Sequence, residues 1–280
     1  MTDSAASVPA DLAGAVSLRV VPMWLTLGDR AVHDGELGLD EVVSRTETGD
    51  FTTSGPTPGE FATAIEAAGA GVGVVVVTLA REMSSTYESA RLAAGLFDDG
   101  RVRVVDSRTA AGAEGLVALA AARCAASGGT LDEVEAAARR VAAQVHLVAA
   151  LESVARVARG GRVPAAAARA GRALGVQPLF EFRDGRARPL VPALSRGAAR
   201  QRLVAAWAKA PAGDRLHLAV MHALDRPGAD ALLAELRARV EPATTFVGSF
   251  SPVMVAHTGP GLLGLAWWWE TAAHGSGAGG

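Results

Sequence analysis

The first half of the chain alternates between short apolar runs and amphipathic stretches. Residues 73–79 contain four consecutive valines, a pattern typical of a strand that is buried on both faces. Residues 101–106 indicate a further strand, and residues 16–27 form a β-rich run broken by Pro22. The helices expected here are residues 57–68, 84–96 and 111–126. Strands and helices alternating at this spacing predict a parallel sheet with flanking helices.

The second half mixes the two patterns less regularly. Its expected helices are residues 131–142, 153–159, 197–208 and 228–240, and its expected strands are residues 145–150, 216–222, 244–248 and 253–256. Residues 176–182 and 187–191 predict a hairpin around Asp184-Gly185. We therefore expect an α/β protein with an N-terminal domain (1–143), a second mixed α/β domain (144–270) and a glycine-rich, disordered tail (271–280).

Composition narrows the function classes. The 280 residues are 50% hydrophobic with a net charge of −2, and the low aromatic content offers no base-stacking surface, so we expect no nucleic-acid partner. Cys124 is the only cysteine, which excludes an internal disulfide and a cysteine metal cluster. Lys209 is the only lysine and follows no glycine-rich loop, so no Walker phosphate loop is present. With no basic leader, and with an apolar run at 71–80 that is too short to span a bilayer, we expect a soluble, cytoplasmic protein.

Three polar loops follow or precede the predicted elements, where a parallel sheet places its ligand-binding edge. They are residues 52–56 with Thr53 and Ser54, residues 83–90 with Ser84, Ser85 and Thr86, and residues 105–108 with Asp106 and Ser107. Hydroxyls and backbone N–H groups at a helix start can bind an anion. Taken alone, the same residues are more typical of ordinary N-caps than of an anion site.

Two further candidates lie in the second half. Arg162 follows Gly160-Gly161, where its guanidinium could pair with a carboxylate or phosphate or could simply lie on the surface. His257 follows the expected strand 253–256, where it could donate to an anion or cap the strand end. A metal site would need Asp3, Asp106 and His257 to meet, and the sequence does not show that they do.

The motifs and their order resemble the DegV family over nearly the whole chain, from Thr2 to about Gly264. The matching segments are Thr2-Asp3-Ser4, Thr53-Ser54-Gly55-Pro56, Met83-Ser84-Ser85-Thr86-Tyr87-Glu88-Ser89-Ala90, Asp106-Ser107, Gly160-Gly161-Arg162 and His257-Thr258-Gly259-Pro260-Gly261. Each motif is weak by itself, and the specificity lies in their common order.

The resemblance implies a fatty-acid-binding protein with two α/β domains and no cofactor other than the bound long-chain fatty acid. It implies that Thr53 and Ser84 hold the carboxylate and that Arg162 and His257 lie near the head group. The remaining loop residues would lie nearby or face a partner: Ser54, Ser85, Thr86, Asp106 and Ser107. The second domain would supply an acyl-chain tunnel from residues 163–174 and the apolar residues up to Phe180. Some members present the acid to a separate fatty acid kinase, so we expect a carrier, not an enzyme.

The sequence also departs from the family pattern. Gly55 stands where glutamine is common, Ser85 where glycine is common, and Ala80-Arg81 where a serine pair is usual. The chain begins at Thr2-Asp3 without the hydrophobic strand that normally precedes this motif, which suggests that the natural protein is longer. Trp267-Trp268-Trp269 either packs on the core as a terminal element, which we favour, or forms a patch for transient contact with a membrane surface.

Two other function classes stay open on sequence grounds. A transferase or hydrolase of a dihydroxyacetone-kinase-like type would use Asp106, Ser84 and His257 as catalytic groups, although no diagnostic spacing supports it. A purely structural protein is the third alternative. Bound lipid would separate the first class from the other two.

Overall fold

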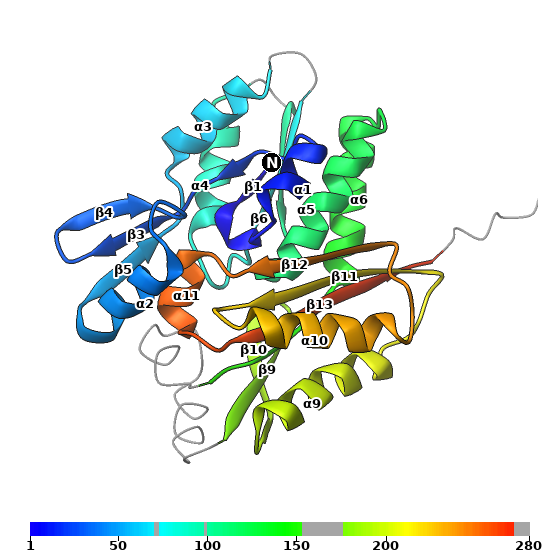
Figure 1. The fold of residues 1–280 in the computed structure, drawn as a ribbon. Helices are drawn as coiled ribbons and strands as arrows, with labels where there is room; N and C mark the ends of the chain where they lie inside the picture. The colour runs from blue at the N-terminus through cyan, green and yellow to red at the C-terminus, as the bar shows by residue number, and fades with distance from the viewer. Residues whose placement is uncertain (70–72, 98–99, 153–175, 272–280) are drawn as a thin grey trace, which may run out of the picture.

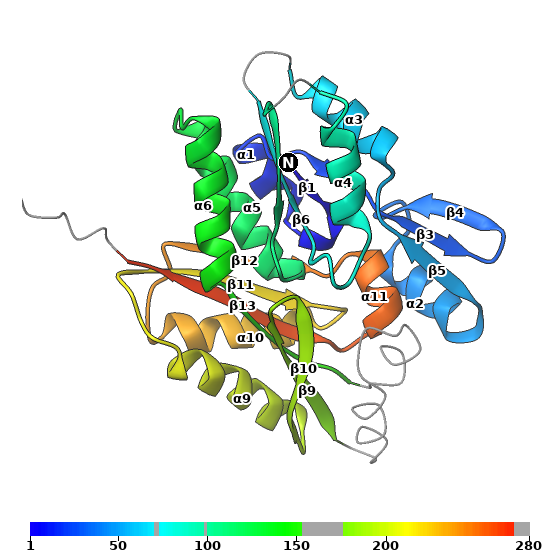
Figure 2. The same ribbon diagram turned by 180° about the vertical axis from the view of Figure 1, so that it is seen from behind.

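The computed structural model describes residues 1–69, 73–97, 100–152 and 176–271, with three β-sheets in this part of the chain. Two of the sheets carry helices on both faces, and the smallest projects to one side (Figures 1 and 2). The predicted α/β class, with a parallel sheet and a mixed sheet, is confirmed.

The first sheet is parallel, in the order β2-β1-β6-β7. Its strands are β1 (Thr2–Asp3), β2 (Val20–Val21), β6 (Val74–Thr78) and β7 (Val102–Asp106). Helices α3 (Pro58–Ala67) and α4 (Thr86–Ala94) cover one face, and α5 (Ala111–Ala126) and α6 (Leu131–Gln144) cover the other. Val76 packs with α3 and α4, whereas Val75 and Val77 pack with α5, which explains why the strand is apolar throughout.

The second sheet is antiparallel, in the order β4-β3-β5. It contains β3 (Trp24–Leu27), β4 (Arg30–His33) and β5 (Phe51–Ser54), and α2 (Leu39–Thr48) connects β4 to β5. The prediction of a loop over residues 52–56 is wrong for Thr52–Ser54, which belong to β5, and neither β4 nor α2 was predicted. Each strand of this sheet has four residues, too few for the alternation of buried and exposed positions to stand out.

The third sheet has six strands in the order β10-β9-β8-β13-β11-β12. They are β8 (His146–Ala150), β9 (Gln177–Arg183), β10 (Arg186–Ala193), β11 (Arg215–His222), β12 (Thr244–Ser249) and β13 (Leu263–Glu270). Helices α9 (Arg196–Lys209) and α10 (Arg226–Arg237) pack on one face, and α5 packs on the other. The predicted hairpin is confirmed as β9 and β10.

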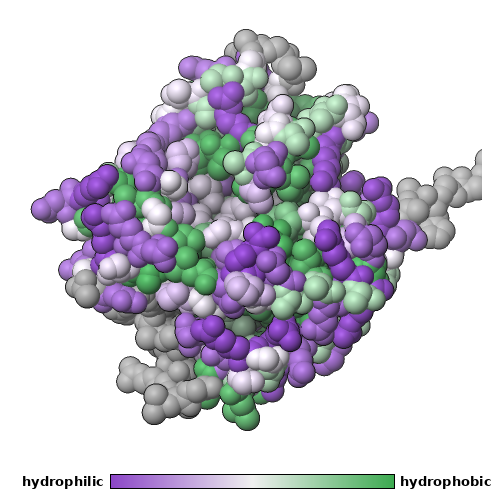
Figure 3. Space-filling model, in the orientation of Figure 1, coloured by the Kyte–Doolittle hydropathy of each residue, from purple (hydrophilic) through white to green (hydrophobic). Residues whose placement is uncertain are grey.

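The tryptophan triplet lies in β13, so the packing interpretation is confirmed. Trp267 is 2% exposed and faces α9 and α10, while Trp268 is 4% exposed and faces the α5 side. These two indoles therefore form part of the core and not an exposed patch. None of the helices in the described part of the chain is long and apolar enough to cross a membrane. On the face in Figure 3, hydrophilic and hydrophobic residues are interspersed.

One predicted strand is a helix. Residues 253–256 belong to α11 (Pro252–Thr258), which Ser251 caps by accepting a hydrogen bond from the Met254 N–H group, with Pro252 at the first position. A short apolar run cannot be assigned by periodicity alone, and here the N-cap and proline signals decide. The predicted helix 153–159, the segment 163–174 and the tail lie outside the described residues.

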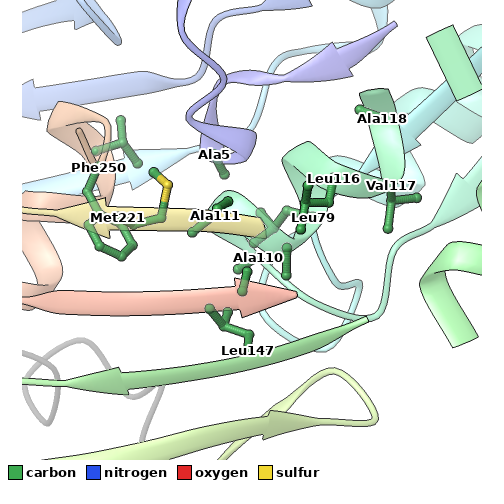
Figure 4. Packing of buried hydrophobic residues seen from close by; sticks show 14 of the residues in the cluster. Ala5, Leu79, Ala110, Ala111, Leu116, Val117, Ala118, Leu147, Met221 and Phe250 are labelled. Atoms are coloured by element: carbon green, nitrogen blue, oxygen red, sulfur yellow. The ribbon is translucent and has the colours of Figure 1, made fainter. Parts of the chain in front are cut away.

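The two larger sheets share one continuous core at the start of α5. Figure 4 shows Ala110 and Ala111 beside Met221 of β11 and Leu147 of β8. Close packing requires small residues here, because a Cβ atom on Gly112 would lie 2.8 Å from the side chain of Met221. The short helices η1 (Ser4–Ala6) and α1 (Ala10–Ala15) pack beside this region. A domain boundary near residue 143, where α6 gives way to β8, stays a prediction.

Candidate functional site

Thr53 and His257 are 204 positions apart in sequence and meet in the structure. The Thr53 hydroxyl and Nε2 of His257 are 2.8 Å apart, a hydrogen bond whose donor depends on the tautomer of the ring. Thr53 is on strand β5, and His257 is in the last turn of α11. The ring of Phe51 packs edge-on against the imidazole, with centroids 5.3 Å apart. A predicted pair of head-group residues is thus brought together from two distant segments.

The second predicted loop forms the start of α4. The hydroxyls of Ser84 and Thr86 are 2.8 Å apart, and the backbone N–H of Thr86 donates to the Ser84 hydroxyl at 3.3 Å. Ser85 occupies the N-cap position without a side-chain capping bond and is exposed. The sequence alternative of simple N-caps therefore does not hold for Ser85, while Ser84 does orient the first turn of the helix.

Gly55 brings the first and second loops into contact. A Cβ atom on Gly55 would lie 2.3 Å from the Thr86 hydroxyl oxygen and 3.1 Å from the Thr86 Cα. Thr86 is fully buried, so it has little room to move away. The close approach of Thr86 leaves no room for a side chain at position 55, which explains why this chain has glycine where the family pattern has glutamine. The segment that carries Thr53 therefore lies against the segment that carries Ser84, through the approach of Gly55 to Thr86.

Asp106 and Ser107 lie where β7 ends, and their side chains bond within the same turn. Asp106 accepts the Arg108 N–H at 2.9 Å, and the Ser107 hydroxyl donates to the Thr109 carbonyl at 3.2 Å. Ser107 is fully buried, whereas Asp106 is partly exposed and lies 3.8 Å from Arg81. These contacts indicate a structural role in the turn; any contact with a ligand or a partner stays a prediction. Ser54 is exposed at the end of β5.

Two carboxylates anchor the segments that carry the site: Asp3, which is fully buried, and Asp34, which is partly buried. Asp3 accepts from the backbone N–H groups of Ala5 and Leu79, both at 2.9 Å, and so fixes the chain as it leaves β6 toward Ser84. Asp34 accepts from the Ser4 hydroxyl at 2.6 Å and the Val253 N–H at 2.9 Å. The second bond ties the hairpin of β3 and β4 to the start of α11. Asp3 was visible as part of the Thr2-Asp3-Ser4 motif, but Asp34 carries no local signal.

Burial shifts the titration of these carboxyl groups. Desolvation raises the pKa of Asp3 to about 6, against two backbone hydrogen bonds that favour the charged form. Glu114, fully buried on α5, has a pKa raised well above its usual range, first by desolvation and then by the charge of Asp3. One oxygen of Glu114 accepts from the Thr2 hydroxyl at 3.1 Å. Desolvation also raises the pKa of Asp34.

Arg162 lies outside the described residues, so its contribution stays a prediction. Within the described ranges, no group of three or more His, Cys, Asp or Glu side chains could hold a metal ion. Asp3 and Asp106 instead make the contacts given above. The described part of the site is therefore a set of hydroxyls, one imidazole and a helix start, which together suit an anionic oxygen group.

A family model described as an uncharacterised protein of the DegV family matches residues 1–270. The chain belongs to the DegV family. A DegV domain-containing protein of Streptomyces coelicolor is 37% identical over 271 residues, covering 95% of this chain and 96% of that protein. One from Mycobacterium tuberculosis is 35% identical over 272 residues, covering 95% of each.

Solved structures of DegV proteins share the fold. A Thermus thermophilus DegV protein described by its fatty acid binding has a TM-score of 0.87 at 29% identity, with 96% of this chain and 98% of that chain covered. A DegV lipid-binding protein of Thermotoga maritima has a TM-score of 0.84 at 26% identity, with 95% and 96% covered. The resemblance stated from the motifs is thereby confirmed, and so is the DegV-like fold.

Proposed function

We propose that this DegV protein binds a long-chain fatty acid, holds its carboxylate with Thr53 and Ser84, and presents it to a separate fatty acid kinase. The observation that carries the binding step is the 2.8 Å contact of Thr53 with His257. Gly55, two residues after Thr53, packs against Thr86 of the Ser84–Thr86 pair. A carboxylate oxygen can accept from both hydroxyls and from a protonated or suitably tautomeric imidazole. The DegV protein of Thermus thermophilus described by its fatty acid binding supports the same ligand class.

In the proposed complex, the acyl tail provides most of the binding affinity, and the head-group contacts provide the orientation. Each buried methylene contributes roughly 0.8 kcal/mol, so a tail of about sixteen carbons supplies on the order of 12 kcal/mol before the costs of binding. The polar residues then need only orient the carboxylate. Under this proposal the tail lies in the second half of the chain, and Arg162 joins His257 near the head group.

The kinase step is supported by a likeness of fold. The same fold occurs in the fatty acid kinase B3 protein of Streptococcus pneumoniae, loaded with linoleic acid, with a TM-score of 0.85 at 18% identity. At that identity the likeness is one of fold alone. In the proposed scheme this protein is the carrier, and the acyl phosphate forms on the partner kinase, with the exposed residues Ser54 and Ser85 facing that partner.

An enzyme of the hydrolase type would need Ser84 paired with His257. The hydrogen bonds described here instead pair His257 with Thr53 and Ser84 with Thr86. Among the residues that the structure describes, no contact between Ser84 and His257 therefore favours the enzyme over the carrier.

The binding proposal is tested by native mass spectrometry of freshly purified protein, followed by extraction and identification of bound lipid. We expect one fatty acid per chain. The variants Thr53→Val and Ser84→Ala should each weaken fatty acid binding by roughly 1–3 kcal/mol, because a buried carboxylate loses a donor. Thr52→Val is the matched control, since Thr52 is exposed on the same strand. Unchanged affinity in both site variants would reject the head-group assignment.

The kinase step has its own experiment. The loaded protein is mixed with ATP and a candidate fatty acid kinase, and acyl phosphate is trapped with hydroxylamine. We expect hydroxamate only when both proteins are present. Hydroxamate formed by this protein and ATP alone would show that it is itself the catalyst, whereas failure with every candidate kinase would leave a binding protein without this partner.

A further inference from the structure

A cavity of about 630 Å3 lies between the C-terminal half of α9 and the ends of β8, β9 and β10. Figures 1 and 2 both show α9 alongside this part of the sheet. Its lining includes Val148, Leu179 and Trp267, which belong to the core cluster packed against α9 and α10. The cavity is thus on the opposite face of the six-stranded sheet from α5, and none of Thr53, Ser84 and His257 lines it.

The charged residues of the cavity are mostly cationic. Arg183, Arg202 and Lys209 line it, opposed by the single carboxylate of Glu181. Arg183 and Lys209 have no ion-pair partner in the part of the chain that the structure describes, and the Arg202 guanidinium donates to the carbonyl oxygen of Val191. This positive cluster occurs in a chain whose net charge is −2. Cations without acidic partners at the edge of a concave surface favour an anionic ligand.

The inner wall of the cavity is apolar, and the cavity has room for the apolar part of a small ligand. Helix α9 contributes Ala205 and Ala206, whose small side chains leave the space open, and the sheet contributes Val148 and Leu179. The indole of Trp267 forms another part of the wall, with His146 stacked on it at a centroid distance of 4.9 Å. The volume lies within the usual range for small-molecule sites, roughly 300–1,000 Å3.

Trp267 forms part of the floor of the cavity and is only 2% exposed. Its N–H group makes no hydrogen bond within the described residues and is itself closed off from solvent. Trp267 therefore offers a ligand an apolar surface and not a hydrogen-bond donor.

We propose that this cavity is a second binding site, for an amphipathic anion that carries a phosphate or carboxylate group on a short apolar body. The anionic oxygens pair with Arg202, Lys209 and Arg183, and the apolar body lies against Ala206 and Trp267. The site acts independently of the fatty-acid head-group residues, because it lies on the other face of the sheet.

The test uses 2-naphthyl phosphate, titrated by calorimetry into the full-length protein after saturation with oleate. We expect the wild type to bind one molecule of 2-naphthyl phosphate per chain. In the double variant Arg202→Gln/Lys209→Gln the Kd should rise at least about tenfold, because the ligand loses one or more charge-assisted contacts. The matched control is Arg237→Gln/Arg239→Gln, at the last residue of α10 and two residues beyond it, which removes the same charge from exposed positions. It should leave the Kd unchanged within about twofold.

Further variants separate the possible outcomes. Ala206→Phe should block the site by filling it without altering charge, and Thr53→Val should leave it intact even if fatty acid binding is lost. Inorganic phosphate should compete at least about tenfold more weakly than 2-naphthyl phosphate, because it lacks the apolar body. The proposal is overturned if the wild type does not bind 2-naphthyl phosphate, or if the double variant Arg202→Gln/Lys209→Gln binds it as tightly as the wild type. It is also overturned if inorganic phosphate competes as well as 2-naphthyl phosphate, or if 2-naphthyl phosphate displaces oleate stoichiometrically.

Discussion

The two halves of the head-group site are built in different ways. Ser84 and Thr86 come from one short segment that follows the central strand β6, and their geometry is largely local. Thr53 and His257 come from a small antiparallel sheet and a seven-residue helix, and 204 positions separate them. Each half is anchored by a carboxylate, the fully buried Asp3 for the first and the partly buried Asp34 for the second. The geometry of the Ser84–Thr86 half should therefore be insensitive to changes elsewhere in the molecule. The geometry of the Thr53–His257 half should depend on the contacts that join its two segments.

The largest expected effect concerns the pH dependence of the local half. The folded protein retains protons on Asp3 and Glu114 at pH values where the unfolded chain has lost them, so the contribution of this pair to the free energy of unfolding falls as the pH rises above about 4. The Asp3 pKa of about 6, against an ordinary value of 3.8, alone corresponds to on the order of 3 kcal/mol.

The double variant Asp3→Asn/Glu114→Gln removes both titrating groups and checks this expectation. The free energy of unfolding of the double variant minus that of the wild type should rise by on the order of 3 kcal/mol between pH 4 and pH 7. Urea unfolding of both proteins at each pH measures this difference. Parallel pH profiles for the two proteins would show that the buried carboxyl pair does not titrate as described.

Asp3→Ala should remove the anchor of the local half. The buried N–H groups of Ala5 and Leu79 lose their acceptor, at a cost of about 2 kcal/mol in the free energy of unfolding, measured at pH 5 by urea denaturation. Asp11→Ala is the control, because Asp11 is exposed in the first turn of α1 and should cost less than about 1 kcal/mol. Equal losses in the two variants would count against the anchoring role.

The contrast between the halves also explains what the sequence could predict. The valine run of β6, the helix start at Thr86 and the capping box of Thr57 are local signals, and the structure has elements at each of them. Strand β5 was misassigned because a four-residue strand acquires its conformation from pairing with a distant strand, here β3. Helix α11 was misassigned because its short apolar run was given more weight than the local signals of Ser251 and Pro252. The family motifs still indicated Thr53 and His257, but neither motif nor periodicity could reveal Asp34 or the approach of Gly55 to Thr86.

That approach joins the two halves, and a double-mutant cycle measures the coupling. Gly55→Ala should cost about 1–2 kcal/mol of stability, because its Cβ would overlap the Thr86 hydroxyl. Thr86→Ala removes that hydroxyl, so the double variant should lose less than the sum of the single changes. Gly59→Ala, at the second residue of α3, is the control and should be close to neutral, because the added Cβ would meet only the Thr57 hydroxyl oxygen, at an ordinary contact distance of 3.9 Å. Additive losses would mean that the loops do not press on each other.

The smallest effect on stability should come from the long-range half, where the consequence for binding is more informative. Asp34→Ala removes the acceptor of the Val253 N–H and of the Ser4 hydroxyl, and should cost about 1 kcal/mol, because Ser251 still caps α11. Asp29→Ala, exposed on the same hairpin, is the matched control.

Because Asp34 ties the hairpin of β3 and β4 to α11, Asp34→Ala should let His257 move relative to Thr53 and so weaken fatty acid binding. Asp34→Asn keeps one acceptor oxygen and should therefore retain part of the affinity. A variant that loses stability but binds fatty acid as well as the wild type would show that the Thr53–His257 contact does not depend on this anchor. The two halves would then differ in sequence separation but not in how firmly they are held.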